Sequence, residues 1–283
     1  MSDKEKFDVT TEVAKEIAKD AYDDVGKPVM KPTGELVGLI PRAIKAALSP
    51  LEKWILQREY NVAETKKLLE EKLQNTPAEL IESPEPHIAV PAMQYISYCM
   101  DNEELREMYA NLLANSMNKV VKNGVHPGFV EIIKQLSPDE AKILRVLKQE
   151  HSVPTISLKY SHKSGGGGIE IIRNFSIIGE QAGCENPYDV NMYFNNLVRL
   201  GLLYDAKGIS YLTNKALYEP LKKHEMIVPY ASNEKANSKG FEEYKFAESY
   251  VELTAYGSSF CDICLSNHET INFTIDENEG IIK

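Results

Sequence analysis

Three short segments of the sequence carry the same signal for the start of a helix. They are Ser49-Pro50-Leu51-Glu52, Thr76-Pro77-Ala78-Glu79 and Ser137-Pro138-Asp139-Glu140. In each segment the hydroxyl can accept a hydrogen bond from a free amide of the first turn, and the glutamate can bind back to the capping residue. Proline suits the first helical position, where its missing N–H has no helix partner to lose. Asp101-Asn102-Glu103-Glu104 is a related start without proline, and the four signals predict a helical first half.

The runs between these starts have helical periodicity. Residues 13–22 have one apolar face, and residues 50–74 have a narrow apolar stripe in a Lys- and Glu-rich segment that predicts a long surface helix. Residues 105–117 repeat apolar side chains at helical spacing and predict a packed core helix. Two prolines within residues 82–86 predict a loop.

The pattern changes after residue 150. Two β-rich runs, 155–160 and 169–172, flank the tetraglycine Gly165–Gly168 and predict a hairpin or flexible loop. The elements predicted beyond it are a short helix ending near Gly183, a helix over 190–200 closed by Gly201, strands over 202–204 and 250–254, a helix over 214–224 and a final helix over 258–265.

Composition limits the class of protein. Hydrophobic residues make up 43% of the 283 residues and charged ones 26%, which is typical of a folded chain. No run approaches the roughly 18 apolar residues that a spanning helix needs, and the first residues lack the apolar core of a secretory signal. Four cysteines in a chain of this length do not predict a disulfide framework. We therefore expect a cytoplasmic protein, whose net charge of −10 argues against a general nucleic-acid coat protein.

No motif in the sequence predicts catalysis, a metal or a cofactor. In the tetraglycine segment Lys163 and Ser164 precede the glycines, whereas a phosphate-binding loop needs them after. Cys261 and Cys264 form a lone CxxC pair with too few further ligands nearby for structural zinc, so buried thiols are expected. The six histidines have no metal-binding spacing, and no nucleophile motif is present.

Residues 36–48 are the most apolar stretch and carry two cations, Arg42 and Lys45. A basic amphipathic helix of this kind can lie in a membrane interface, which would place the protein peripherally at the inner membrane face. Two charges attract anionic lipid only weakly, so a buried helix is the favoured interpretation.

Element order over residues 137–265 is similar to that of a winged helix, with an insertion near 205–248. The run from Leu197 to Leu203 resembles the end of a recognition helix, and Leu253-Thr254-Ala255-Tyr256-Gly257 resembles the returning wing strand. Residues 138–264 carry 14 Lys and Arg against 16 Asp and Glu, so sequence-specific DNA binding is disfavoured and protein binding is favoured.

The expected fold is therefore mainly α with a smaller α+β part, a helical domain followed by a winged-helix-like domain. The expected limits are 1–35 for an N-terminal amphipathic helix and linker, 36–136 for the helical domain, 137–265 for the winged-helix-like domain and 266–283 for a loose polar tail.

Three passages of the helical half are long and specific: Pro50–Ile55, Glu103–Ala114 and His126–Ala141. They resemble the abortive infection alpha family, and the resemblance extends from Gly38 to Leu147. It implies a prokaryotic or phage-borne protein connected with phage resistance through death or arrest of the infected cell. It brings no catalytic residues, and its specific residues read as helix caps, turns and core.

We therefore expect a non-enzymatic phage-defence protein that recognises another macromolecule, most simply a host or phage protein. A DNA-binding regulator and a membrane-active effector that uses residues 36–48 are the alternatives, and a homo-oligomer is compatible with the long 50–74 helix. The candidate binding residues, chosen as polar or aromatic groups on apolar elements or on the expected recognition helix, are Trp54, Arg106, Tyr109, His126, Asn191, Asn195 and Arg199.

Overall fold

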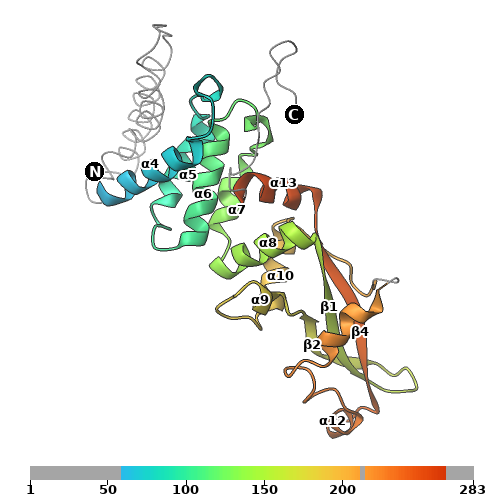
Figure 1. Ribbon diagram of the computed structural model, residues 1–283. Helices are drawn as coiled ribbons and strands as arrows, with labels where there is room; N and C mark the ends of the chain where they lie inside the picture. The colour runs from blue at the N-terminus through green and yellow to red at the C-terminus, as the bar shows by residue number, and fades with distance from the viewer. Residues whose placement is uncertain (1–58, 211–213, 266–283) are drawn as a thin grey trace, which may run out of the picture. The chain divides into compact units, whose positions relative to one another are not determined.

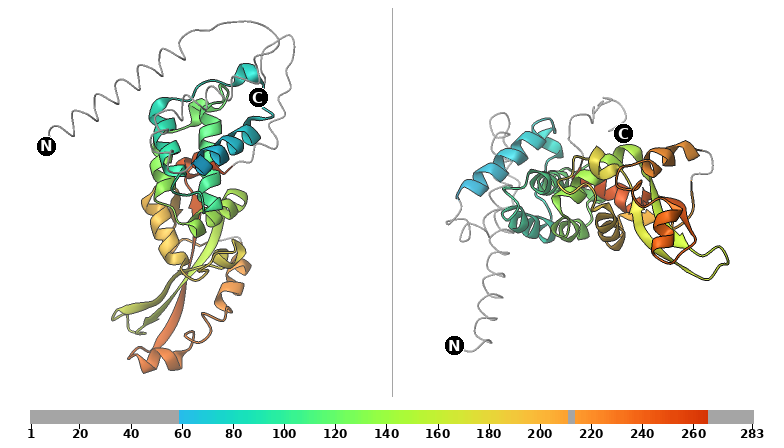
Figure 2. Two further views of the ribbon diagram at one scale, coloured as in Figure 1. Left: turned by 90° about the vertical axis from the view of Figure 1, so that its left-hand side faces the viewer. Right: turned by 90° about the horizontal axis from the view of Figure 1, so that it is seen from below.

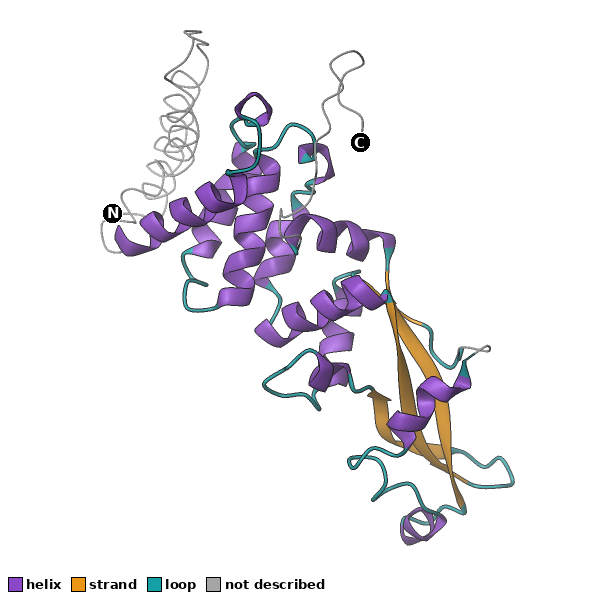
Figure 3. Cartoon of the chain, in the orientation of Figure 1, coloured by secondary structure: helices purple, strands orange, loops and turns teal. Residues whose placement is uncertain are grey.

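The computed structural model describes residues 59–210 and 214–265. Over these residues the fold is mixed α+β, with ten α-helices and one four-stranded antiparallel sheet (Figure 1). In the described part of the chain, the elements before Ser152 are helices and 3₁₀ turns joined by loops, and the first strand begins at Ser152 (Figure 3). The predictions for Trp54, for the helix start at Ser49 and for residues 1–35, 36–48 and 266–283 lie outside the described residues.

The chain divides into two compact units. The first comprises the chain up to Lys134 together with the residues from Ile263 onward, and the second runs from Gln135 to Asp262. The elements of the first unit are α4 (Glu59–Leu73), η2 (Ala78–Leu80), α5 (Pro86–Ile96), α6 (Glu103–Ser116), η3 (Lys122–Gly124) and α7 (Gly128–Lys134).

Helix α6 is the centre of the first unit. Asn102 caps its start by accepting a hydrogen bond from the amide of Leu105 at 2.9 Å, as the sequence predicted. Residues 108–116 are all buried, because α4, α5 and α7 pack against this helix. The core helix predicted over 105–117 is confirmed.

The prediction that a helix starts at Thr76 is wrong. Only the 3₁₀ turn η2 follows, its first residue is preceded by Pro77, and no side chain caps it. The chain leaves the turn at once because Ile81 forms a β-bridge with Asn118. Pro84 and Pro86 then prevent a helix from re-forming until α5 begins at Pro86, so the predicted loop over 82–86 is confirmed up to that residue.

Two buried asparagines of α6 bind the end of α13 (Ala255–Cys264), the last described helix. The Asn111 side chain donates to the carbonyl of Cys264 at 2.9 Å, and the Asn115 side chain donates to the carbonyl of Ile263 at 2.7 Å. The last carbonyls of a helix have no partner within the helix, so these amides satisfy groups that burial would otherwise leave unpaired. The polar residues in the core helix therefore have a packing role.

The second unit combines short helices with the sheet. Its elements are α8 (Pro138–Glu150), β1 (Ser152–Ser161), β2 (Gly168–Phe175), α9 (Ile178–Gln181), α10 (Val190–Arg199), β3 (Leu203–Asp205), η4 (Lys215–Tyr218), α11 (Glu219–Lys222), α12 (Asn233–Ser238), β4 (Glu243–Leu253) and most of α13.

The sheet has the strand order β2-β1-β4-β3. Strands β1 and β2 form the predicted hairpin, and the glycine loop between them uses positive φ angles at Gly165 (+83°) and Gly167 (+98°) that glycine adopts without strain. Strand β4 pairs with all of β1 and is eleven residues long, whereas the sequence predicted only 250–254. Its first half was missed because Glu243–Ser249 mixes charged and apolar residues and reads as surface loop.

Part of the predicted insertion covers one face of the sheet. Tyr218, Leu221 and Ile227 are buried against Ile156 and Phe175 in one apolar cluster, and the turns of η4 and α11 lie along the strands (Figure 2). The helix predicted over 214–224 is present as these two short turns rather than as one helix. Tyr218, Leu221 and Ile227 are therefore part of the core of the second unit.

Candidate recognition surface on helix α10

Helix α10 has one buried and one exposed face. Its buried side chains recur at helical spacing, as the sequence predicted, and the helix stops before Gly201, which has φ +75°. The buried residues are Val190, Tyr193, Phe194 and Leu197. On the other side, Met192 is 58% exposed and Val198 37% exposed, and Asn195 between them is also exposed. We call Met192, Asn195 and Val198 the α10 face.

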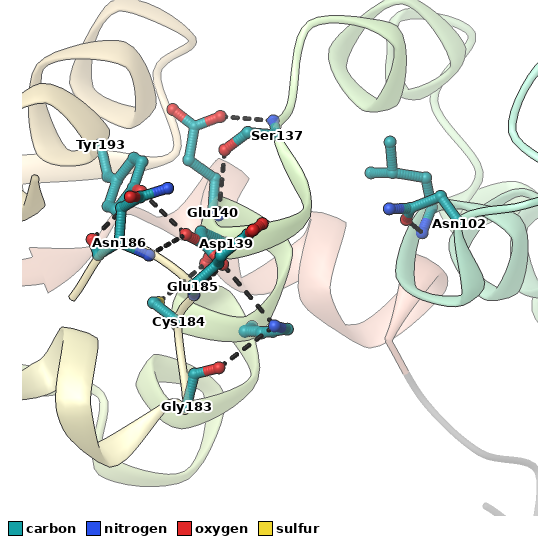
Figure 4. Close-up of polar contacts among 11 residues, drawn as sticks. Asn102, Ser137, Asp139, Glu140, Gly183, Cys184, Glu185, Asn186 and Tyr193 are labelled. Atoms are coloured by element: carbon teal, nitrogen blue, oxygen red, sulfur yellow. Dashed lines mark hydrogen bonds and ion pairs between the residues drawn. The ribbon is translucent and has the colours of Figure 1, made fainter.

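A buried carboxylate at the start of α8 holds the loop that leads into α10 (Figure 4). One oxygen of Asp139 accepts from the backbone amide of Glu185 at 2.9 Å, and the other accepts from the amide of Asn186 at 3.0 Å. The second oxygen also accepts from the Tyr193 hydroxyl at 2.8 Å, which ties α10 itself to α8. Asp139 therefore fixes both the loop and the first turn of α10.

The electrostatics of this network favour the charged form of Asp139. Burial by itself raises the pKa of Asp139, but the amides of Asn186 and Glu185, the Tyr193 hydroxyl and the nearby Lys142 together lower that pKa below its ordinary value. Burial and the Asp139 carboxylate raise the pKa of the Cys184 thiol to about 11, so Cys184 is a neutral thiol at physiological pH. The network is a fixed structural support with an ionised acid at its centre.

The predicted capping box of α8 is confirmed and contributes a second tie to α10. The Ser137 hydroxyl accepts from the amide of Glu140, and the Glu140 carboxylate accepts from the amide of Ser137 at 2.6 Å. The other Glu140 oxygen accepts from the Asn196 side chain at 2.8 Å. The capping residue Glu140 of α8 thereby also binds Asn196 on α10.

Arg199, the cation of α10, is engaged by Asn196 of its own helix and by Gln135, which precedes α8. Its guanidinium donates to the Asn196 side-chain oxygen at 2.6 Å and to the Gln135 side-chain oxygen at 3.0 Å. Asn191 is half-buried, and among the described residues its Oδ1 has no hydrogen-bond partner. Of the candidates predicted on this helix, Asn195 and Arg199 are exposed, and Arg199 lies one turn beyond Asn195 on the same side of the helix as the α10 face.

Three of the candidate binding residues lie in the described part of the first unit, and each forms a hydrogen bond with a backbone group. The Arg106 guanidinium donates to the carbonyl of Met100 at 2.8 Å and so fastens the turn before α6. Tyr109 is fully buried, and its hydroxyl donates to the carbonyl of Val130 at 3.3 Å. The exposed His126 ring accepts from the amide of Gly128 at 3.0 Å, at the start of α7. These three residues lie in the first unit, apart in the chain from the α10 residues of the second, and Trp54 lies outside the described residues.

The two cysteines of the CxxC pair are buried thiols, as predicted. Burial raises the pKa of Cys261 to about 12, although Lys148 nearby acts in the opposite direction. Over the described ranges there is no group of three or more His, Cys, Asp or Glu placed to hold a metal ion. The same residues include no helix that is both long and apolar enough to cross a membrane.

The sequence interpretation missed Met192, although a methionine opposite the apolar stripe of an amphipathic helix is a visible signal. It also missed Asp139, which it treated only as an acidic residue of a helix start. No local signal marks that role, because the donors to Asp139 lie more than forty residues away along the chain.

Comparison with known proteins places the sequence in a family. The sequence model of abortive infection alpha matches residues 57–264. The chain belongs to the abortive infection alpha family. The match confirms the predicted resemblance and carries it through the whole second unit. Membership suggests a role of this abortive infection alpha protein in phage defence.

No curated protein matches the abortive infection alpha chain significantly. Among solved structures, it is similar to an uncharacterized protein from the hydrocarbon-degrading marine bacterium Alcanivorax borkumensis SK2. The identity is 16%, the alignment covers 49% of this chain and 92% of the other, and the TM-score is 0.34.

Proposed function

We propose that this abortive infection alpha protein acts in phage defence by binding another protein through the α10 face, without catalysing a reaction itself. The observation that carries the proposal is the chemistry of that face. It presents two exposed apolar side chains and a neutral amide beside Arg199, whose guanidinium is bound to Asn196 and Gln135, on a helix held by Asp139 and Glu140. Exposed methionine and aliphatic groups on a fixed helix are typical of protein contact surfaces.

The topology supports a winged-helix interpretation of the second unit. The order α8, β1, α9, α10, β3, β4 and the pairing of β4 between β1 and β3 are those expected of that fold, to which β2 and the insertion are additions. In such a fold α10 would be the recognition helix, whose exposed face makes the specific contacts.

Charge favours a protein partner over DNA. Helix α10 carries a single cation, and Arg199 is already bound to Asn196 and Gln135. In a winged helix the N-terminal end of the recognition helix would face the bases. Asp189 is exposed at this end of α10, and Glu185 is exposed in the loop just before it. Carboxylates there would repel phosphate, which proteins contact mainly with Lys and Arg.

The test is protection of phage-challenged bacteria by the wild type and by Met192→Glu. The matched control is Ile169→Glu, which places the same charge at another exposed aliphatic position, near the glycine loop of β2. We expect Met192→Glu to lose protection while its circular dichroism stays that of the wild type, and Ile169→Glu to protect normally. Full protection by a folded Met192→Glu would refute the proposal.

Binding of the purified full chain to duplex DNA separates the two partner classes. A protein-binding role predicts weak binding with no sequence preference. Tight binding that falls steeply with salt and is lost in Arg199→Ala would overturn the proposal in favour of a DNA-binding regulator.

A further inference from the structure

Three exposed apolar side chains come from the start of α10 and from the part of the insertion that contacts it. Tyr188 is 43% exposed, Met192 one turn further along is 58% exposed, and Met226 from the insertion is 39% exposed. The insertion comes close here because the Tyr188 hydroxyl donates to the Glu225 carboxylate at 3.4 Å and its ring lies 6.0 Å from that of His224. We call Tyr188, Met192 and Met226 the Tyr188 patch.

His224 holds the segment of the insertion that carries Met226. Its ring packs on Phe175 at 4.9 Å, and its Nε2 lies 3.2 Å from the Glu180 carboxylate. Its Nδ1 accepts from the amide of Met226 at 3.2 Å, so the loop that carries Met226 is fixed. A partner would meet a preformed surface and lose little free energy in ordering it.

The rim of the patch is acidic. Glu225 and Asp189 are exposed, Asp189 makes no capping hydrogen bond to α10, and the Glu180 side chain is 40% exposed. The neighbouring cation Lys223 has a carboxylate partner of its own, since its Nζ lies 3.8 Å from Glu219. Three exposed carboxylates therefore lie on the segments that carry the apolar side chains or contact them.

We propose that the Tyr188 patch docks a protein segment whose apolar side chains are flanked by lysine or arginine, such as one face of a cationic amphipathic helix. The proposal rests on the proposed function and deepens it by naming the chemistry of the partner. Tyr188 supplies a rigid anchor of large area, and the two methionines adapt to the side chains that pack on them. The three carboxylates attract the flanking cations and repel acidic segments and nucleic acid.

The experiment uses the full chain and two synthetic helical peptides that share one leucine stripe. One carries arginine beside the stripe and the other carries glutamate. Fluorescence anisotropy at low and high salt gives the two affinities. We expect the arginine peptide to bind at least about tenfold more tightly than the glutamate peptide, with a preference that shrinks at high salt.

Charge reversal identifies the surface. The variant Asp189→Lys/Glu225→Lys should reverse the peptide preference, whereas Glu150→Lys/Glu234→Lys, which changes two exposed carboxylates elsewhere in the unit, should keep it. Met192→Glu should weaken the arginine peptide about tenfold or more. Equal binding of both peptides, or an unchanged preference in Asp189→Lys/Glu225→Lys, would overturn the proposal.

The two proposals fail in different ways. If Met192→Glu abolishes phage protection while the wild type does not distinguish the peptides, the α10 face has a role but the partner is not cationic. If the peptides behave as expected while Met192→Glu still protects, the patch binds cationic segments but phage defence does not depend on it.

Discussion

Replacing Asp139 by asparagine removes one charge and one acceptor from the centre of the support beneath α10. The aspartate accepts three hydrogen bonds with its two oxygens, from the amides of Glu185 and Asn186 and from the Tyr193 hydroxyl. An asparagine has one oxygen, and its NH₂ group must face at least one of these donors. The shape of the side chain hardly changes, so the effect reports on the hydrogen bonds.

The magnitude follows from counting these bonds. In its better orientation the side-chain amide of the variant Asp139→Asn keeps two donors on its oxygen and leaves one buried N–H unpaired, which costs about 2 kcal/mol. The two retained bonds lose their ionic character, which costs about 0.5 kcal/mol each. We therefore expect Asp139→Asn to lower the free energy of unfolding of the second unit by about 3 kcal/mol, a factor of about a hundred in its unfolding equilibrium.

The stabilisation that the Asp139 carboxylate provides is present at neutral pH and is lost in acid. The pKa of Asp139 is lowered in the folded protein, so the unfolded chain takes up a proton first as the pH falls. The stabilisation is complete above the ordinary aspartate value of 3.8 and is lost as the pH falls through the lower folded value. The difference in free energy of unfolding between the wild type and Asp139→Asn is therefore constant near neutral pH and becomes smaller in acid.

The assay is urea denaturation followed by circular dichroism, with amide hydrogen exchange at Glu185 and Asn186 as the local measurement. Glu150→Gln, which makes the same kind of change at an exposed position, is the control and should leave stability unchanged. Wild-type exchange rates at residues 185 and 186 in Asp139→Asn, or a stability gap that widens in acid, would refute this account of the network.

Three further predictions concern the same unit. Ser137→Ala removes half of the capping box and should cost about 1 kcal/mol in urea denaturation, against no change for Ser164→Ala in the exposed glycine loop; equal stabilities would contradict the cap. Gly179→Ala should lower the thermal midpoint far more than Gly166→Ala, because a Cβ at 179 would lie 2.2 Å from a backbone carbonyl oxygen whereas one at 166 has its nearest neighbour at 3.8 Å. Cys261 should resist iodoacetamide in the native protein at neutral pH, since it is buried and its pKa is raised to about 12, and should react after unfolding; rapid native labelling seen by mass spectrometry would contradict this.

Local interactions explain why much of the secondary structure could be predicted. The cap at Asn102 and the box at Ser137 each join groups three residues apart, and both are present. The periodicity of α10 and the glycine after it also depend only on neighbouring residues. The exception is Thr76, where a correct local signal was overruled by the pairing of Ile81 with Asn118.

The candidate site could be predicted only in part. Asn195 lies on a helix that its own periodicity predicts, whereas the hydroxyl of Tyr109 donates to the carbonyl of Val130, a partner twenty-one residues away along the chain that no local pattern indicates. The Tyr188 patch requires the insertion to return to the start of α10, which no local pattern predicts. The charge of α10 was predictable, but the binding of Arg199 to Gln135 was not.

The sequence by itself determined the starts of α6 and α8, the amphipathic helix α10 and a hairpin or loop at the tetraglycine, and its longer motifs carried the resemblance to the abortive infection alpha family. The local elements depend on hydrogen bonds, dihedral preferences and apolar spacing within a few residues. Only the tertiary structure decided that Asp139 supports α10 and that the insertion covers the sheet. A buried carboxylate or aromatic ring takes its partners from whatever the folded chain brings beside it, and those partners are distant in sequence.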